Sequence, residues 1–105
     1  MGMMKLEIPH TLTHDDAKAR VTALLDYWTR KYGVKASWAG DKATFVGKVM
    51  GVTFDGWLTV AAGRVGGEAT DPGMLLRGQT QKYLHRKFGD YLDSKKTLAD
   101  VQGEV

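Results

Sequence analysis

Two histidines near the N-terminus have the residue type and spacing that could support chemistry. His10 and His14 are four residues apart, which on a helix places two imidazoles on one face as metal ligands. Thr13 begins a capping-box pattern, so the predicted helix starts there and leaves His10 outside it. The chain has no cysteine, and a third ligand would have to be a carboxylate such as Asp15. We therefore interpret the stretch as the junction between a strand and a helix, and expect no metal site.

Other residue types that serve enzymes are no better placed. Neither Ser37 nor Ser94 lies in a Gly-x-Ser-x-Gly elbow. The glycine-rich run GRVGG at 63–67 lacks the lysine and the following helix of a phosphate-binding loop. Asp55 lies in the middle of a predicted strand, on the solvent face, where a solvated carboxylate is commoner than a general base. We expect no catalytic residue and no cofactor, and a protein that is not an enzyme.

Hydrophobic periodicity predicts the first two elements. Apolar and polar residues alternate over 4–8, which predicts a strand that ends at Pro9. From Thr13 onward apolar residues recur at helical spacing until Gly33, which would end the helix in a left-handed conformation. Trp28 lies on this apolar stripe, and we expect it at the centre of the core.

The remainder of the chain predicts a sheet and a second helix. Between 34 and 70 the period changes to two, which predicts four short strands. Three glycines would mark bulges or bends in them, namely Gly47, Gly51 and Gly56. A second helix is expected over about 74–92. The residues expected on its apolar stripe are Leu76, Tyr83, Leu84, Phe88 and Tyr91.

The order β-α-β-β-β-β-α predicts a single α+β domain over 1–105, with two helices packed on one face of a curved antiparallel sheet. We expect an ordered core over about 4–92 and a frayed tail over 93–105. No apolar run is long enough to cross a bilayer, and nothing at the N-terminus resembles a signal peptide. A cytoplasmic location is therefore expected.

Two surfaces of the predicted fold are candidates for binding a partner. The sheet face away from the helices would carry an apolar patch suited to a partner, a second copy in a homodimer, or a hydrophobic surface. Its candidate residues are Val46, Met50 and Trp57. The second helix carries an excess of positive charge that favours an anionic surface. Its candidate residues are Arg77, Lys82, Arg86 and Lys87. The aromatic residues between them are better explained as core, so we do not expect nucleic acid as the partner.

With these residues in view, the chain resembles the polyhydroxyalkanoic acid system family, small bacterial proteins encoded among polyhydroxyalkanoate genes. The resemblance begins in KLEIPHTLTHDDAKARV at 5–21 and continues through WAGDKATFVGKVMGVTFDGWLTV at 38–60. The basic second helix completes it, so that it covers about Met4 to Leu92. It implies a link to granules of storage polyester, whose surface carries structural and regulatory proteins. It supplies no catalytic residue to carry over.

Three hypotheses follow for function. The first is a non-enzymatic accessory protein that contacts the polyhydroxyalkanoate granule surface or granule proteins through the apolar sheet face and the basic helix. The second is a carrier of a small hydrophobic ligand or lipid, with a pocket lined by Phe45, Phe54 and Trp28. The third is a nucleic-acid-associated regulator, whose binding would depend on Arg86 and Lys87 and would fall steeply with salt.

Overall fold

The computed structural model describes residues 3–49, 52–70 and 73–97, which form two helices and a five-stranded sheet. The elements are β1 (Met3–Pro9), α1 (His14–Tyr32), β2 (Lys35–Ala39), β3 (Lys42–Val49), β4 (Val52–Ala61), β5 (Arg64–Thr70) and α2 (Met74–Tyr91). Their order along the chain is the one that hydrophobic periodicity predicts, and it confirms the α+β class. Met50 and Gly51, which were singled out in the sequence, lie outside the described residues.

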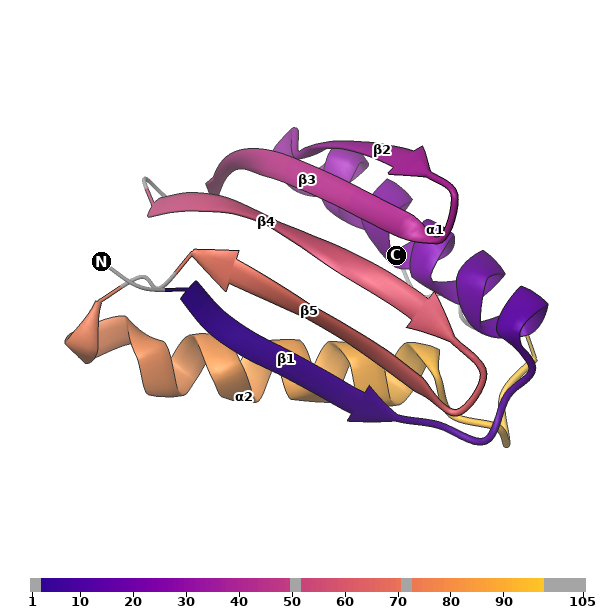
Figure 1. Ribbon diagram of the computed structural model, residues 1–105. Coiled ribbons are helices and arrows are strands. Elements are labelled where there is room, and N and C mark those ends of the chain that lie inside the picture. Colours follow the sequence, from indigo (N-terminus) through magenta and orange to yellow (C-terminus); the bar gives the residue numbers. More distant parts are fainter. Residues whose placement is uncertain (1–2, 50–51, 71–72, 98–105) are drawn as a thin grey trace.

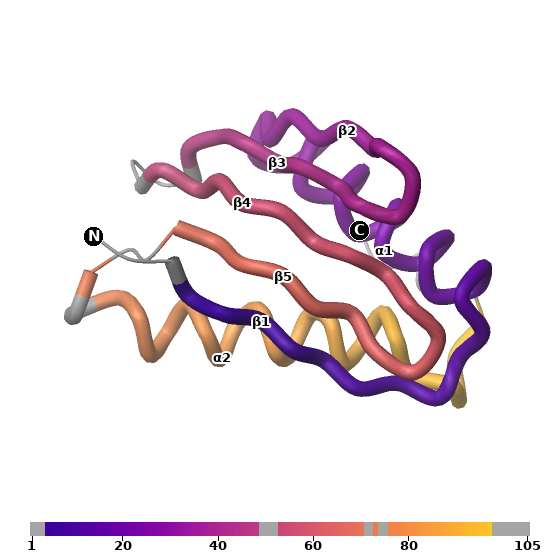
Figure 2. The backbone as a smooth tube through the Cα atoms, viewed as in Figure 1, coloured from indigo at the N-terminus to yellow at the C-terminus, as the bar shows by residue number. Residues whose placement is uncertain are grey.

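The sheet is open and wholly antiparallel, with the strand order β1-β5-β4-β3-β2. The first strand therefore pairs with the last one, and β1 and β2 form the two edges. Figures 1 and 2 show that the sheet is curved and that both helices lie on one of its faces. This arrangement confirms the predicted architecture. Neither of these helices covers the opposite face, so among the described residues that face has no helix over it.

The first helix begins and ends where the sequence predicts. The backbone N–H of Asp16 donates to the hydroxyl of Thr13 at 3.2 Å, which satisfies one of the free donors of the first turn. Gly33 ends the helix in the left-handed region at φ 73°, and its own N–H bonds to the carbonyl of Thr29. The predicted junction between strand and helix is therefore confirmed.

Trp28 lies at the centre of the core, as predicted, and is only 2% exposed. Its ring centroid lies 5.3 Å from that of Phe54, 6.0 Å from Phe88 and 6.1 Å from Phe45. The indole Nε1–H donates to the hydroxyl of Tyr83 at 3.2 Å, so its one polar group is paired. The ring thus joins α1 to the sheet and to α2.

The strand glycines serve close approach and do not form bulges. The pairing of β3 with β4 and of β4 with β5 runs through Gly47 and Gly56 without an inserted residue. A Cβ on Gly56 would lie 2.1 Å from the carbonyl oxygen of Glu68, and one on Gly47 would lie 3.0 Å from Val34. Of the predicted bulges or bends, bulges are wrong for these two positions, because the pairing is continuous. Glycine is needed there because the neighbouring backbones approach too closely to admit a side chain.

The second helix buries only the later part of its predicted apolar stripe. Leu84, Phe88 and Tyr91 are buried, whereas Leu76 is 38% exposed, so its predicted place in the core is wrong. Leu76 lies in the first turn of α2, to which Gly73 supplies no capping side chain. Neither helix, within the part of the chain that the structure describes, is long and apolar enough to span a membrane.

A buried arginine, which the sequence did not single out, fixes the end of α2. Arg20 in α1 is 3% exposed and forms an ion pair with Asp16 at 3.0 Å. Its guanidinium donates to the carbonyl oxygens of Tyr91, Asp93 and Lys96. These bonds hold the chain that follows α2 against the start of α1.

Candidate functional site

The uncovered sheet face places Val46 and Trp57 on neighbouring strands. Val46 in β3 pairs with Asp55, and Trp57 lies two residues further along β4, so both apolar side chains are on this face in diagonal positions. Val46 is 50% exposed, which is high for an apolar residue. The third predicted member of the patch, Met50, lies outside the described residues. The structure thus brings two of the three together.

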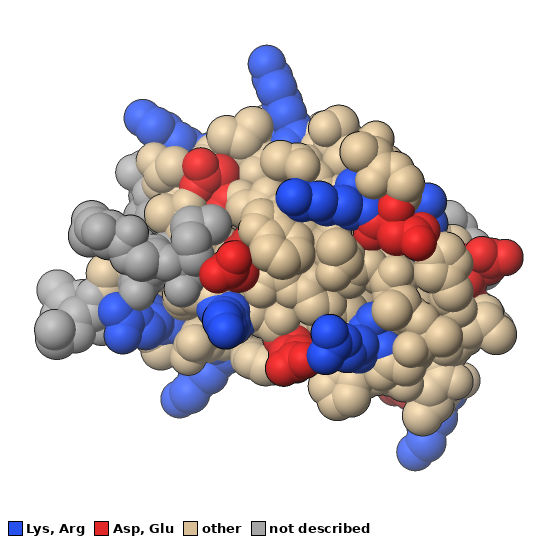
Figure 3. Space-filling view, viewed as in Figure 1, with Lys and Arg blue, Asp and Glu red and all other residues tan. Residues whose placement is uncertain are grey.

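Lysines surround this apolar pair. Lys35 is the cross-strand partner of Val46 on β2, and Lys48 lies two residues along β3 on the same face. The Nζ of Lys42 lies 5.0 Å from the ring centroid of Trp57, within the range of a cation–π contact. Figure 3, which views the sheet side, shows Lys and Arg side chains around a central uncharged area, with acidic groups among them.

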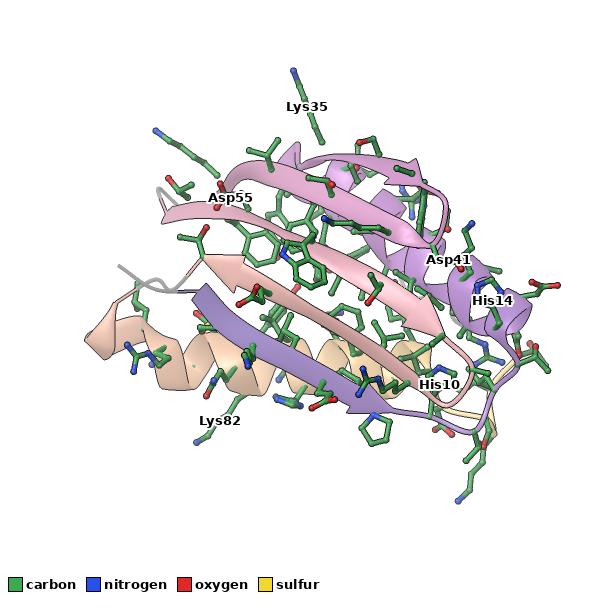
Figure 4. All side chains as sticks on the ribbon, in the orientation of Figure 1. His10, His14, Lys35, Asp41, Asp55 and Lys82 are labelled. Carbon is green, nitrogen blue, oxygen red and sulfur yellow. The ribbon has the colours of Figure 1, made fainter. Side chains whose placement is uncertain are left out.

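Asp55 lies on the same face and is half-buried. Its Oδ1 atom is inaccessible to solvent and has no hydrogen-bond partner among the residues that the structure describes. The expectation of a solvated carboxylate is therefore wrong for this oxygen. Figure 4 shows Asp55 at the β3–β4 side of the sheet, away from His14 and Asp41.

The four predicted basic residues of α2 do not form one patch. Arg77, Lys82 and Arg86 are exposed, whereas Lys87 is half-buried and lies against α1. Figure 4 shows Lys82 pointing away from the sheet. Lys82 and Arg86 are one turn apart and share a face, but Arg77 lies in the first turn of the helix. The helix therefore offers a small solvent-facing basic pair and a separate lysine at the α1–α2 seam.

At this seam two lysines contact a tyrosine of α1 that sequence reasoning missed. Tyr27 is 7% exposed, and the Nζ of Lys31 donates to its hydroxyl at 3.1 Å. The Nζ of Lys87 lies 4.7 Å from the centroid of the same ring. The pKa of Tyr27 is lowered, mainly by the hydrogen bond from Lys31, with a further contribution from the charge of Lys87. The spacing of Tyr27 and Lys31 is visible in the sequence, but the approach of Lys87 is not.

His14 links the start of α1 to the turn between β2 and β3. Its Nε2 lies 2.7 Å from Oδ1 of Asp41, and its Nδ1 lies 3.0 Å from Oδ1 of Asp15. Lys18 donates to the carbonyl of Gly40 in the same turn. The pKa of His14 is raised by the hydrogen bond to Asp15 and next by the one to Asp41. Figure 4 shows His14 and Asp41 facing each other.

His10 has a separate, structural position. Its Nδ1 accepts the backbone N–H of Leu12 at 3.0 Å, so its other ring nitrogen carries the proton and donates to the carbonyl of Ala61 at 3.0 Å. The two histidines therefore do not share a site. Within the described residues, no group of three histidine, aspartate or glutamate side chains is placed to hold a metal.

An open groove of about 360 Å³ lies between α1 and the end of α2. Its lining residues are Ala23, Asp26, Thr29, Arg30 and Tyr91. They include an acid, a base and a hydroxyl, so the groove suits a polar molecule better than a lipid. The rings of Trp28, Phe45 and Phe54, expected to line a lipid pocket, pack against one another with Phe45 and Phe54 stacked at 5.1 Å. This packing does not favour the hypothesis of a hydrophobic-ligand carrier.

The fold and these surfaces define a small α+β domain with an uncovered sheet face and a basic seam between its helices. The family model described as "Putative polyhydroxyalkanoic acid system protein (PHA_gran_rgn)" matches residues 4–95, and the chain belongs to this family. The predicted resemblance is thereby confirmed. No curated protein and no solved structure matches the chain.

Proposed function

We propose that the protein is a non-enzymatic accessory module that associates with the surface of polyhydroxyalkanoate granules or with granule proteins. Membership of the family supports the granule context. The observation that carries the proposal is the exposed Val46 beside Trp57 on the sheet face opposite α1 and α2. Apolar side chains that share an uncovered face commonly mark a contact surface.

In this proposal Val46 and Trp57 are the apolar anchors and the surrounding lysines supply attraction. Burial of the two side chains against the granule coat would remove apolar surface from water. Lys35, Lys42 and Lys48 would face the same coat and interact favourably with anionic headgroups or acidic proteins. The sequence suggested that the positive charge of the contact comes from α2. In this proposal it comes from the lysines of the sheet. The location that follows is cytoplasmic, at the granule.

The test is localisation of a fluorescently tagged full chain in granule-forming cells. Wild type is expected on the granules and Trp57→Ala diffuse, with circular dichroism of the purified variant confirming that it folds. Leu76→Ala is the matched control, because Leu76 is an exposed apolar residue on α2 and not on the sheet. A diffuse wild type, or a folded Trp57→Ala that stays on granules, contradicts the proposal.

The charged part of the contact has its own comparison. Replacement of Lys35, Lys42 and Lys48 by glutamine is expected to lower the amount of protein recovered with granules. The amount that remains bound should depend less on salt concentration. The control is Lys82→Gln with Arg86→Gln, which changes the exposed pair on α2. The same proteins, run on a sizing column without granules, show whether a second copy of the chain occupies the sheet face instead. A stable wild-type dimer that Trp57→Ala dissociates would replace the granule contact with a homodimer.

A further inference from the structure

We propose that the seam between α1 and α2 contains a binding site for a phosphoryl group, formed by Lys31, Lys87 and Tyr27. The proposal shares only Lys87 with the basic residues predicted from the sequence, and none of the three lies on the sheet face. It concerns a ligand of stated chemistry and does not depend on the contact through Val46 and Trp57.

The geometry brings two ammonium groups from different helices to one phenol. Lys31 follows Tyr27 by one turn of α1, and its Nζ lies 3.1 Å from the hydroxyl and 5.4 Å from the ring centroid. Lys87 comes from α2, and its Nζ lies 4.7 Å from the same centroid. Tyr27 itself is buried, so its ring is held in place and both ammonium groups lie against it.

The charges at this place are unbalanced. In the part of the chain described here, neither Lys31 nor Lys87 forms an ion pair with a carboxylate. Two positive charges that share one neutral phenol repel each other, and an anion between them would remove that repulsion. The lowered pKa of Tyr27 is the response expected of a phenol in a positive potential.

A phosphoryl group fits these donors better than a carboxylate does. Its dianion neutralises two ammonium groups, and its three oxygens can accept from both lysines and from the Tyr27 hydroxyl. Arg86, the neighbour of Lys87 in the sequence, belongs to the solvent-facing pair of α2, with its guanidinium 5.8 Å from the ring centroid of Tyr83, and adds to the positive charge of the helix. The site therefore combines positive charge with three hydrogen-bond donors, two from α1 and one from α2.

The groove described above is lined by none of the three residues of the site, but it is lined by sequence neighbours of Tyr27 and by Tyr91, one turn after Lys87, and it would hold the remainder of the ligand. Ala23 and Arg30 line this groove and lie one turn before and one turn after Tyr27 on α1. The acid of Asp26 and the hydroxyl of Thr29 also line it, and they suit hydroxyl groups on the molecule that carries the phosphate. The geometry points to a phosphate monoester with a polar remainder, either a soluble metabolite or a lipid headgroup.

The experiment measures binding of two probes to the purified full chain. Glycerol 3-phosphate is titrated by calorimetry and by NMR of the lysine side chains, and vesicles of phosphatidylcholine with or without phosphatidate are tested by co-sedimentation. Saturable binding of glycerol 3-phosphate supports a soluble monoester, and binding only to phosphatidate vesicles supports a headgroup. Lack of binding to both probes overturns the proposal.

Matched variants separate a specific site from general attraction to positive charge. Lys31→Gln with Lys87→Gln is expected to weaken binding about tenfold for each lysine removed, the effect of losing a charged hydrogen bond. Lys82→Gln with Lys95→Gln removes two positive charges at exposed positions outside the seam and the sheet face, and should leave binding unchanged. An equal loss in both double variants overturns the proposal.

The phenol gives a second measurement. A bound anion offsets the lysine charges, so saturating glycerol 3-phosphate is expected to raise the pKa of Tyr27, followed by ultraviolet absorbance of the phenolate. Tyr27→Phe identifies that transition against those of the other three tyrosines. Binding that leaves the Tyr27 titration unchanged overturns the assignment to this seam.

Granule localisation of the same variants separates this proposal from the granule contact. Lys31 is not on the sheet face and Trp57 is not at the seam, so the localisation of each variant distinguishes failure of this site from failure of the granule contact.

Discussion

The guanidinium of Arg20 in α1 donates to the main-chain oxygen of Tyr91, 71 residues later, at a distance of 3.2 Å. Tyr91 is the last residue of α2, where the final carbonyls have no partner within the helix. A side chain from one helix therefore completes the hydrogen bonding of the other, and it also holds the carbonyls of Asp93 and Lys96.

Replacing this arginine is expected to destabilise the fold. Arg20→Met removes the donors but retains an apolar stem, and we expect the free energy of unfolding to fall by about 2–4 kcal/mol, because buried carbonyls lose their partners. Urea denaturation measures the loss, and hydrogen exchange should show that it is concentrated at the end of α2. Arg20→Lys should recover little of this lost stability, since an ammonium group cannot reproduce the planar, forked set of donors of a guanidinium. A fully stable Arg20→Met would show that packing alone holds this end.

Alanine at two different glycines is expected to have opposite effects. Gly56→Ala places a Cβ where the carbonyl of Glu68 would be 2.1 Å away, so a strand must shift, at a cost of about 1–3 kcal/mol or more. Gly78 is exposed in α2. Apart from its chain neighbours and its own helix backbone, no atom of the described residues lies within 4 Å of the Cβ that alanine would add, and Gly78→Ala should gain about 1 kcal/mol from helix propensity. Thermal and urea unfolding compare the two variants. A Gly56→Ala variant as stable as wild type would contradict the close approach at Gly56, and a destabilised Gly78→Ala would contradict the gain expected in α2.

Truncation of the central tryptophan is expected to loosen the whole core. Trp28→Ala should lower the free energy of unfolding by about 3–5 kcal/mol, because Trp28 contacts the sheet and α2 through Phe45 and Phe88. Trp28→Phe should cost less, since it keeps most of the ring and loses the bond to Tyr83. Chemical denaturation gives the energies, and near-ultraviolet circular dichroism reports the packing. A cost for Trp28→Ala below that of Trp28→Phe would be inconsistent with this core.

The contact of His14 with the β2–β3 turn is expected to depend on pH. The pKa of His14 is raised above its usual 6.5 by the hydrogen bonds to Asp15 and Asp41, so the contact favours the protonated ring. Its contribution to stability is therefore complete below pH 6.5 and is lost as the pH rises through the raised pKa. Lys18 also faces Asp41, with its Nζ 3.7 Å from the Oδ1 atom.

Two proteins are compared to measure this dependence. The difference in unfolding free energy between wild type and His14→Gln should be larger in mild acid than in mild alkali. His85→Gln, at an exposed position on α2, is the control for loss of a histidine. Proton NMR of the imidazoles gives the titration of His14 directly. A difference that grows with increasing pH would show that the neutral ring is the stabilising form.

The elements of the fold could be predicted because their signals are local. The cap at Thr13 and the stop at Gly33 each depend on neighbours within one helical turn, and strand alternation depends on neighbours two residues apart. Leu76 shows the limit of such patterns. It has the correct spacing for the apolar stripe of α2, but it lies in the first turn, where the side chain remains exposed.

The surfaces were predicted less well because they depend on contacts distant in sequence. Val46 and Trp57 could be placed together from strand alternation, since β3 and β4 are consecutive. The contact of Tyr27 with Lys87 joins two helices that are separated in the sequence by β2 to β5, and no local pattern indicates which side of each helix faces the other. Arg20 was missed for the same reason, because its partners follow it by more than seventy residues.

The pairing of β1 with β5 has a consequence for the order in which the chain is made. Met4 pairs with Ala69, so the first strand leaves the ribosome long before the strand that it must join. The hairpins of β2 to β5 can form earlier, since they connect neighbours, but β5 then has an unpaired edge until β1 arrives. A nascent chain in which substitutions prevent β1 from pairing would thus expose the edge of β5 to other molecules. Selection on Met4, Leu6 and Ile8 would therefore act against aggregation during synthesis as well as for the folded core.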